Sequence, residues 1–156
     1  MGNKLSYPAL LDIPPLFHEL SFNDIENLCV NSFINNSRRK QLLTNFKTLI
    51  IDVLERENIS CNIWIDGSFS TEKEEPDDID LVIELPPSKD MNMYNNITTK
   101  IFNNRTQREF HDEFHYDVYF FTKNNDTMYK YWSGFFSHNR DDSPKGIILY
   151  KINGGI

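Results

Sequence analysis

Long apolar runs, cysteine and glycine are all scarce in this sequence, and each shortage excludes a class of protein. No apolar stretch approaches the roughly 20 residues of a membrane-spanning helix, so an integral membrane protein is excluded. Six glycines and seven prolines exclude collagen-like and low-complexity chains. Two cysteines, Cys29 and Cys61, are too few for a disulfide framework and lack zinc-site spacing. We expect both to be reduced, partly buried thiols.

Aromatic residues, in contrast, are plentiful. The 156 residues include 12 Phe, 7 Tyr and 2 Trp, enough to fill the core of one domain. We therefore expect a single domain over residues 1–156, with a core at about residues 38–121, an N-terminal lead-in and helix, and a C-terminal helix and strand. The N-terminus lacks a secretory pattern, which predicts a cytoplasmic protein, although residues 1–6 fit a loose myristoylation pattern at Gly2.

Negative charge is concentrated in one segment. The net charge of the chain is −7, and Glu72–Glu84, with seven acidic residues and one lysine, contributes −6 of it. The rest of the chain is nearly neutral, so the broad basic surface of a nucleic-acid-binding protein is missing. Negative charge at this density repels itself, which predicts a cation in this segment.

Periodicity and capping signals predict an α+β protein with a small mixed β-sheet flanked by helices. Ser21 and Asp24 resemble a capping box at the start of a short helix, and Asn36 with Ser37 can begin a longer helix that ends near Arg56. The predicted strands are Cys61–Asp66, Ile79–Leu85, Phe114–Phe121 and Ile147–Ile152, and further helices are predicted around Tyr94–Phe102 and Met128–Phe136. Residues 1–20, rich in proline, are expected to be extended.

Three aspartates carry the predicted chemistry. Asp78 and Asp80 have the same strand parity and point to one face, while the apolar residues between and after them point to the other. Two carboxylates about 4 Å apart repel by about 4 kcal/mol at an effective dielectric constant of 20, so they favour a bound divalent cation. Asp117 is the lone carboxylate of a later strand, and a neighbouring strand position would bring it beside Asp78 and Asp80. Three carboxylates can hold two Mg²⁺ ions.

A Gly-Ser turn precedes the acidic strand. Gly67 permits a turn that a side chain would block, and Ser68 adds a hydroxyl, so this turn could hold phosphate oxygens through its backbone N–H groups. Lys73 is the lone cation of the acidic segment and could contact a phosphate or only solubilise the surface.

These residues resemble the nucleotidyltransferase superfamily typified by DNA polymerase beta. The pattern of that superfamily is Gly-Ser, a spacer of about nine to a dozen residues, Asp-x-Asp and a later strand Asp, and nine residues separate Ser68 from Asp78 here. More narrowly, the chain is similar to a family of short bacterial proteins with this domain. The shared features are Pro14-Pro15, Asn36 with Arg38 and Arg39, Gly67–Lys73, Pro76–Asp80 and Pro144–Gly146.

The resemblance implies a minimal polymerase-beta-type fold and transfer of a nucleoside monophosphate from an NTP, with ATP the first choice. Asp78, Asp80 and Asp117 would be the catalytic metal ligands for two Mg²⁺ ions, with Mn²⁺ as an alternative, and Gly67, Ser68 and Lys73 would bind the nucleotide. The acceptor stays open: a protein hydroxyl, a tRNA end or a small molecule. A toxin–antitoxin or phage-defence role and a homodimer are further expectations. The alternatives are a catalytically silent binding module or antitoxin, and a metal-dependent phosphohydrolase or nuclease.

Other polar and aromatic residues have simpler interpretations. We expect His111 and His115 to be surface and strand-packing residues, and Arg38 and Arg39 to open a helix, although either could reach a phosphate. Lys145 fits a structural turn. The aromatic residues of the 128–136 helix favour a core or partner surface over a base-stacking shelf; they are Tyr129, Tyr131, Trp132, Phe135 and Phe136.

Overall fold

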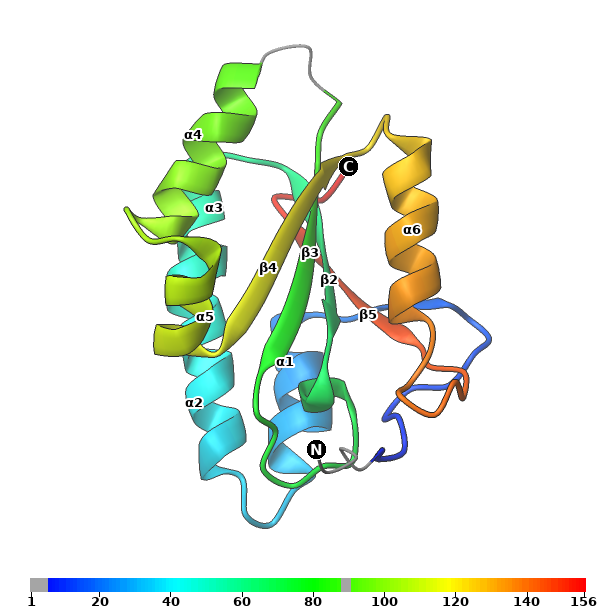
Figure 1. The fold of residues 1–156 in the computed structure, drawn as a ribbon. Coiled ribbons are helices and arrows are strands. Elements are labelled where there is room, and N and C mark those ends of the chain that lie inside the picture. Colours follow the sequence, from blue (N-terminus) through cyan, green and yellow to red (C-terminus); the bar gives the residue numbers. More distant parts are fainter. Residues whose placement is uncertain (1–5, 88–90) are drawn as a thin grey trace.

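A five-stranded mixed β-sheet with strand order β1-β5-β2-β3-β4 forms the centre of the fold (Figure 1). This computed structural model describes residues 6–87 and 91–156, so the pattern at Gly2 lies outside the described residues. The strands are β1 (Phe17–Glu19), β2 (Cys61–Asp66), β3 (Ile79–Leu85), β4 (Tyr116–Thr122) and β5 (Ile147–Ile152). β2 is antiparallel to both β3 and β5, whereas β3 pairs in parallel with β4 and β1 with β5.

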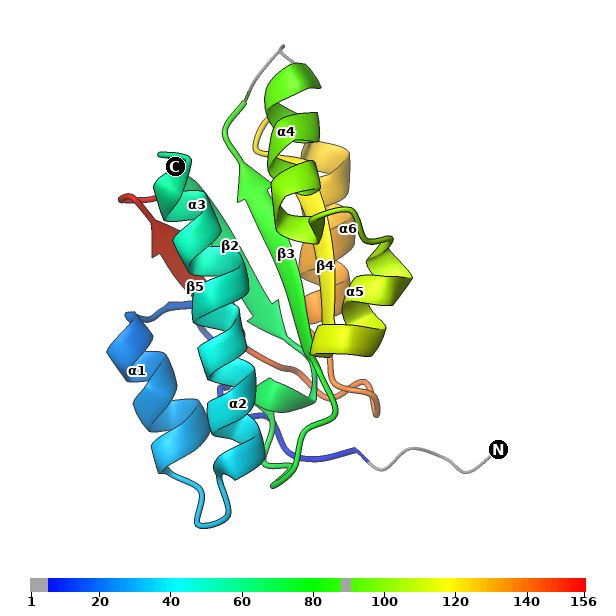
Figure 2. The ribbon, with the colours of Figure 1, turned by 90° about the vertical axis from the view of Figure 1, so that its left-hand side faces the viewer.

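The helices cover the two faces of the sheet unequally. The helices are α1 (Phe22–Glu26), α2 (Ser37–Phe46), α3 (Asp52–Arg56), α4 (Met91–Phe102), α5 (Gln107–Phe114) and α6 (Asp126–Phe136), with π-helical stretches at Asn27–Asn31 and Lys47–Ile51. Helices α1 to α5 lie on one face and α6 lies on the other (Figures 1 and 2). The second face is therefore only partly covered, and this leaves room for a site.

Strand alternation divides the apolar side chains between two cores. In β3, Leu81 and Ile83 join the large core beneath α1 to α5, whereas Val82 joins a smaller core beneath α6. Trp64 of β2 and Phe121 of β4 also belong to the smaller core, with ring centroids 5.3 Å apart. Helices packed on both faces of a mixed sheet confirm the predicted α+β class.

Most predicted elements are confirmed, and three of the predicted strands have the observed bounds. The strand predicted at Phe114–Phe121 begins two residues later, because Phe114 ends helix α5 and His115 follows it in the left-handed region (φ 62°). The sequence analysis missed α5 although Thr106 and Glu109 form a capping box at its start.

The ends of the chain contribute more to the sheet than predicted. β1 lies within the lead-in that we expected to be merely extended, and it pairs with β5. β5 in turn lies between β1 and β2, so the C-terminal strand is part of the sheet interior rather than an addition to a core ending near residue 121.

Smaller expectations also have outcomes in the structure. Ser21 and Asp24 do form a capping box, but Asn36 makes no capping hydrogen bond and instead donates to the Val30 carbonyl at 3.2 Å. Cys29 and Cys61 are free thiols, both fully buried. Across residues 6–87 and 91–156, no helix combines the length and apolarity needed to cross a bilayer.

Candidate metal centre

Three aspartates lie in a row across the partly covered face of the sheet. Asp80 of β3 is directly opposite Asp66 of β2 in the antiparallel pair and opposite Asp117 of β4 in the parallel pair. Residues opposite each other in a sheet project to the same face. The predicted approach of Asp117 to Asp80 is therefore confirmed, and Asp66 is an additional carboxylate that the sequence analysis did not assign to the site.

Asp78 completes the cluster from just outside the sheet. It precedes β3 by one residue and is half-buried, so it joins Asp80 from the loop rather than from within the strand. Asp78 and Asp117 each place a carboxylate oxygen within 4.8 Å of the other. The predicted trio thus lies at one end of β3 and β4.

Crowding of these carboxylates changes the acidity of Asp80. The pKa of Asp80 is raised from 3.8 to about 8, first by burial and then by the charges of Asp78, Asp66 and Asp117 and a hydrogen bond with Asp117. Without a cation, the cluster therefore keeps a proton at neutral pH. Oxygen donors at this density suit a hard divalent cation, whose charge would replace that proton. The residues present fit the Mg²⁺ that the resemblance implies.

The Gly67–Ser68 turn lies against Asp80. Gly67 has φ +85°, and a Cβ atom there would lie 3.0 Å from the Asp80 backbone nitrogen, so only glycine fits. The Ser68 hydroxyl accepts a hydrogen bond from the Asp77 N–H at 3.1 Å and donates to the Asp78 carbonyl at 3.5 Å. In the structure, Ser68 therefore joins the turn to the loop that carries Asp78.

A buried ion pair occupies the far side of the row. Lys145, from the loop before β5, pairs with Asp66, and its ammonium group also donates to the Gly67 carbonyl at 3.1 Å. Both side chains are less than one-tenth exposed. Burial raises the pKa of Asp66, and Lys145 opposes that rise. Lys145 thus neutralises Asp66, the carboxylate at one end of the row.

Two arginines at the start of α2 hold the acidic loop through its backbone. Arg39 is fully buried and donates to the carbonyls of Phe69 and Thr71, both at 2.7 Å, and to that of Lys73. Arg38 donates to the Pro76 and Asp77 carbonyls at 3.2 and 2.7 Å. Both arginines therefore do more than open a helix, since together they fix the course of residues 69–77.

Lys73 lies at the cavity but is engaged by a neighbour. Its ammonium group is 2.6 Å from the Asp77 carboxylate and 5.7 Å from the centre of the Tyr7 ring. Lys73 thus pairs with an acidic side chain at the cavity wall, and its predicted contact with a phosphate stays a prediction.

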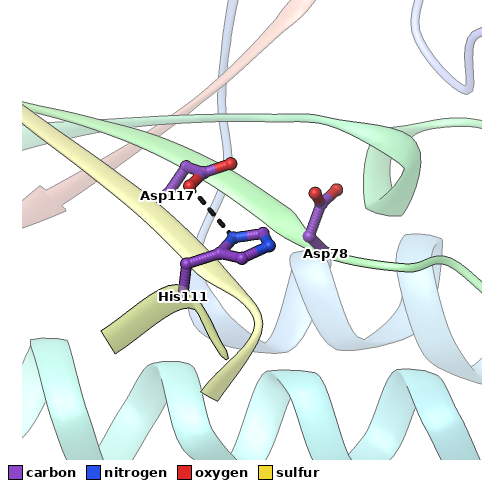
Figure 3. A group of neighbouring side chains, drawn as sticks. All are labelled: Asp78, His111 and Asp117. Atoms are coloured by element: carbon purple, nitrogen blue, oxygen red, sulfur yellow. Dashed lines mark ion pairs between the residues drawn. The ribbon is translucent and has the colours of Figure 1, made fainter. Parts of the chain in front are cut away.

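His111 approaches the carboxylates from helix α5. Its Nδ1 atom lies 3.0 Å from Asp117 Oδ1 (Figure 3). His111 is thus partly exposed, and it also contacts a strand residue of the carboxylate cluster. His115 is exposed, with its ring centroid 6.4 Å from that of His111.

A cavity of about 810 Å³ opens over the carboxylates. Its walls include all four aspartates, Gly67, Ser68 and Lys145 on the sheet side, and Phe135, His138 and Arg140 on the side of α6. Phe135 is 61% exposed, whereas Trp132 and Phe136 of the same helix are buried in the smaller core. The predicted core role is thus confirmed for Trp132 and Phe136, whereas Phe135 lines the cavity.

A protein-family model matches residues 8–151, a range that contains all the residues named above as cavity walls. The chain belongs to the DUF6932 family. This family is described as one of unknown function. No curated protein and no solved structure matches the chain. Membership in DUF6932 therefore tells which proteins the chain is related to but assigns no activity. An activity has to be inferred from the geometry of the cavity.

Proposed function

We propose that this DUF6932 protein is a Mg²⁺-dependent nucleotidyltransferase that moves a nucleoside monophosphate from an NTP to an acceptor and releases pyrophosphate. The observation that carries the proposal is the register of β3 and β4, which sets Asp80 opposite Asp117 beside Asp78 and the Gly67–Ser68 turn. The resemblance of these motifs to the polymerase-beta superfamily supports the same conclusion.

The cavity suits a nucleotide in size and in the nature of its walls. Its volume of about 810 Å³ lies within the range of about 300–1,000 Å³ that is typical of small-molecule sites. The carboxylates form one wall and the exposed Phe135 ring belongs to the other, so a triphosphate at the first wall would leave the base near an aromatic face.

Asp78, Asp80 and Asp117 would hold the metal. Bound Mg²⁺ supplies charge neutralisation and polarisation at the transferring phosphoryl group. The acceptor hydroxyl attacks the α-phosphorus, the bond from that phosphorus to the bridging oxygen breaks, and pyrophosphate leaves. Asp117, the second residue of β4, would take the hydroxyl proton. The backbone of the Gly67–Ser68 turn would hold the triphosphate tail.

Two buried cations next to the carboxylates fix these reactive groups in place. Arg39 holds the carbonyls of the loop that follows the Gly-Ser turn, and Lys145 keeps the Asp66 charge away from the phosphates. Rigid support of this kind lowers the cost of aligning substrate and catalytic groups.

The variant Asp117→Asn tests the assignment. We expect transfer of an α-phosphate label from NTP to fall by at least about 100-fold, and NTP affinity to fall by less than about tenfold, because Asp78 and Asp80 still hold the metal. Asp112→Asn is the matched control, since Asp112 is an exposed α5 residue that contacts only Arg108 among the ion pairs of the described residues. Equal losses of transfer and affinity would contradict the role of Asp117.

A further inference from the structure

The position of His111 adds a nitrogen donor to the carboxylate cluster. Helix α5 runs directly into β4 through the left-handed His115, and this sharp turn sets the last turn of α5 against the first residues of β4. His111 consequently lies beside Asp117 although five residues separate them in the sequence. Its Nδ1 atom is closed to solvent and lies 3.0 Å from Asp117 Oδ1.

The imidazole ring of His111 lies between two carboxylates. In Figure 3, one ring nitrogen faces Asp117 and the other is on the side of Asp78. Asp78, His111 and Asp117 each offer one ligand atom, and these three atoms all lie within 4.8 Å of one another. A metal–ligand bond is about 2.0–2.2 Å long, so two ligand atoms of one small cation lie at most about twice that distance apart. Modest side-chain rotation would therefore bring all three atoms to one ion.

The donor set carries information about the metal. Mg²⁺ prefers oxygen ligands and keeps much of its water, whereas first-row transition ions accept imidazole together with carboxylate. Two carboxylates and one imidazole are therefore a better match for Mn²⁺ than for Mg²⁺.

We propose that His111 binds the metal ion directly through a ring nitrogen, together with Asp78 and Asp117. This nitrogen ligand gives the site a preference for Mn²⁺ over Mg²⁺. This inference rests on the proposed function only in that both place a metal at Asp78 and Asp117. Asp80, which is hydrogen-bonded to Asp117, stays available for a second ion.

A competing role for His111 needs no metal. In that role the imidazole would hold the Asp117 carboxylate in place without contacting an ion. The two roles differ in one observable, which is whether a nitrogen atom is bonded to the metal ion.

Pulsed electron paramagnetic resonance of the full chain loaded with Mn²⁺ makes that distinction. The wild-type protein is expected to give the hyperfine coupling of a directly bound imidazole nitrogen, and this coupling should change in kind when the chain is made with ¹⁵N-labelled histidine. The isotope experiment needs no substitution and shows whether a histidine nitrogen is bound, and the variants below assign that nitrogen to one of the four histidines. A spectrum without nitrogen coupling would overturn the inference, even if Mn²⁺ loses the signals of its bound water when it binds to the protein.

Two asparagine variants supply the matched comparison. His111→Asn should abolish the coupling and weaken Mn²⁺ binding by at least about tenfold, since losing even an outer-sphere partner of a metal ligand costs about 10–100-fold. Its Mg²⁺ affinity should change by less than about twofold. His115→Asn, at an exposed position whose φ of 62° asparagine tolerates, should keep both the coupling and the affinity.

The outcomes separate this inference from the proposed function. Mg²⁺-dependent transfer without nitrogen coupling to Mn²⁺ would overturn the role of His111 alone. Nitrogen coupling in a protein that transfers no label would support the role of His111 and contradict nucleotidyl transfer. Equal weakening of Mn²⁺ and Mg²⁺ binding in His111→Asn would also overturn the inference, because it would indicate a general effect on the site.

Discussion

Replacing Asp80 by asparagine should stabilise the protein when no metal is bound. The pKa of Asp80 is raised from 3.8 to about 8, first by burial and then by three neighbouring carboxylates. The folded state therefore keeps a proton that the unfolded chain releases, and the free energy of unfolding falls as pH rises from about 4 to about 8. Asparagine carries no charge, so Asp80→Asn escapes this loss.

The size of the gain follows from that rise in pKa. The pKa rises from 3.8 to about 8, and each pKa unit corresponds to about 1.4 kcal/mol, so the gain in the free energy of unfolding is at most about 6 kcal/mol. We expect about 2 kcal/mol at pH 8, since Asp66, Asp78 and Asp117 remain and single substitutions change stability by about 0.5–3 kcal/mol. For a chain of 156 residues this raises the melting temperature by about 4–8 °C.

A bound metal should reverse the order of stability. At a concentration of 100 times its Kd, Mg²⁺ should stabilise the wild type by about 2.7 kcal/mol, and Asp80→Asn should gain little because it has lost a ligand. Thermal unfolding in chelator and in Mg²⁺, at pH 5 and pH 8, measures all four cases. Asp112→Asn, which removes the same charge from an exposed site, should show neither effect. A variant less stable than wild type in chelator at pH 8 would refute the reasoning.

The supports of the site make two further predictions. Lys145→Met should lower the free energy of unfolding, measured in urea, by about 3–5 kcal/mol. The loss should be larger at pH 8 than at pH 5, because Asp66 without its partner must stay protonated in the folded state. Adding Asp66→Asn should restore most of the lost stability. A double variant as unstable as the single one would contradict this account. Arg39→Lys should speed amide hydrogen exchange in residues 69–73, since lysine lacks the planar set of donors that holds these carbonyls, and unchanged exchange there would contradict the role of Arg39.

The sequence was sufficient to predict the carboxylates of β3 and β4. In both strands the aspartates share a face opposite the apolar residues of the large core, and burial of those apolar residues fixes the register. Asp80 and Asp117 could therefore be placed together without coordinates. Gly67 was also predictable, because its turn admits no side chain next to Asp80.

The supporting residues could not be placed in the same way. Lys145 meets Asp66 and Gly67 only because β5 pairs with β2, a contact between residues almost 80 positions apart. His111 reaches Asp117 through a helix whose capping signal at Thr106 was overlooked. Arg39 binds backbone carbonyls, which every residue carries, so no side-chain pattern marks its partners.

Transfer of label from ATP labelled at the α- or the γ-phosphate tests the central claim most directly. The protein, Mg²⁺ or Mn²⁺, and a lysate of its host are incubated with each form, and protein, RNA and small molecules are then separated. The account predicts that, compared with lysate alone, the protein makes α-label but not γ-label become covalently attached to one acceptor. Extra release of γ-label as orthophosphate without attachment of α-label would contradict it, and so would binding of every NTP without any attachment.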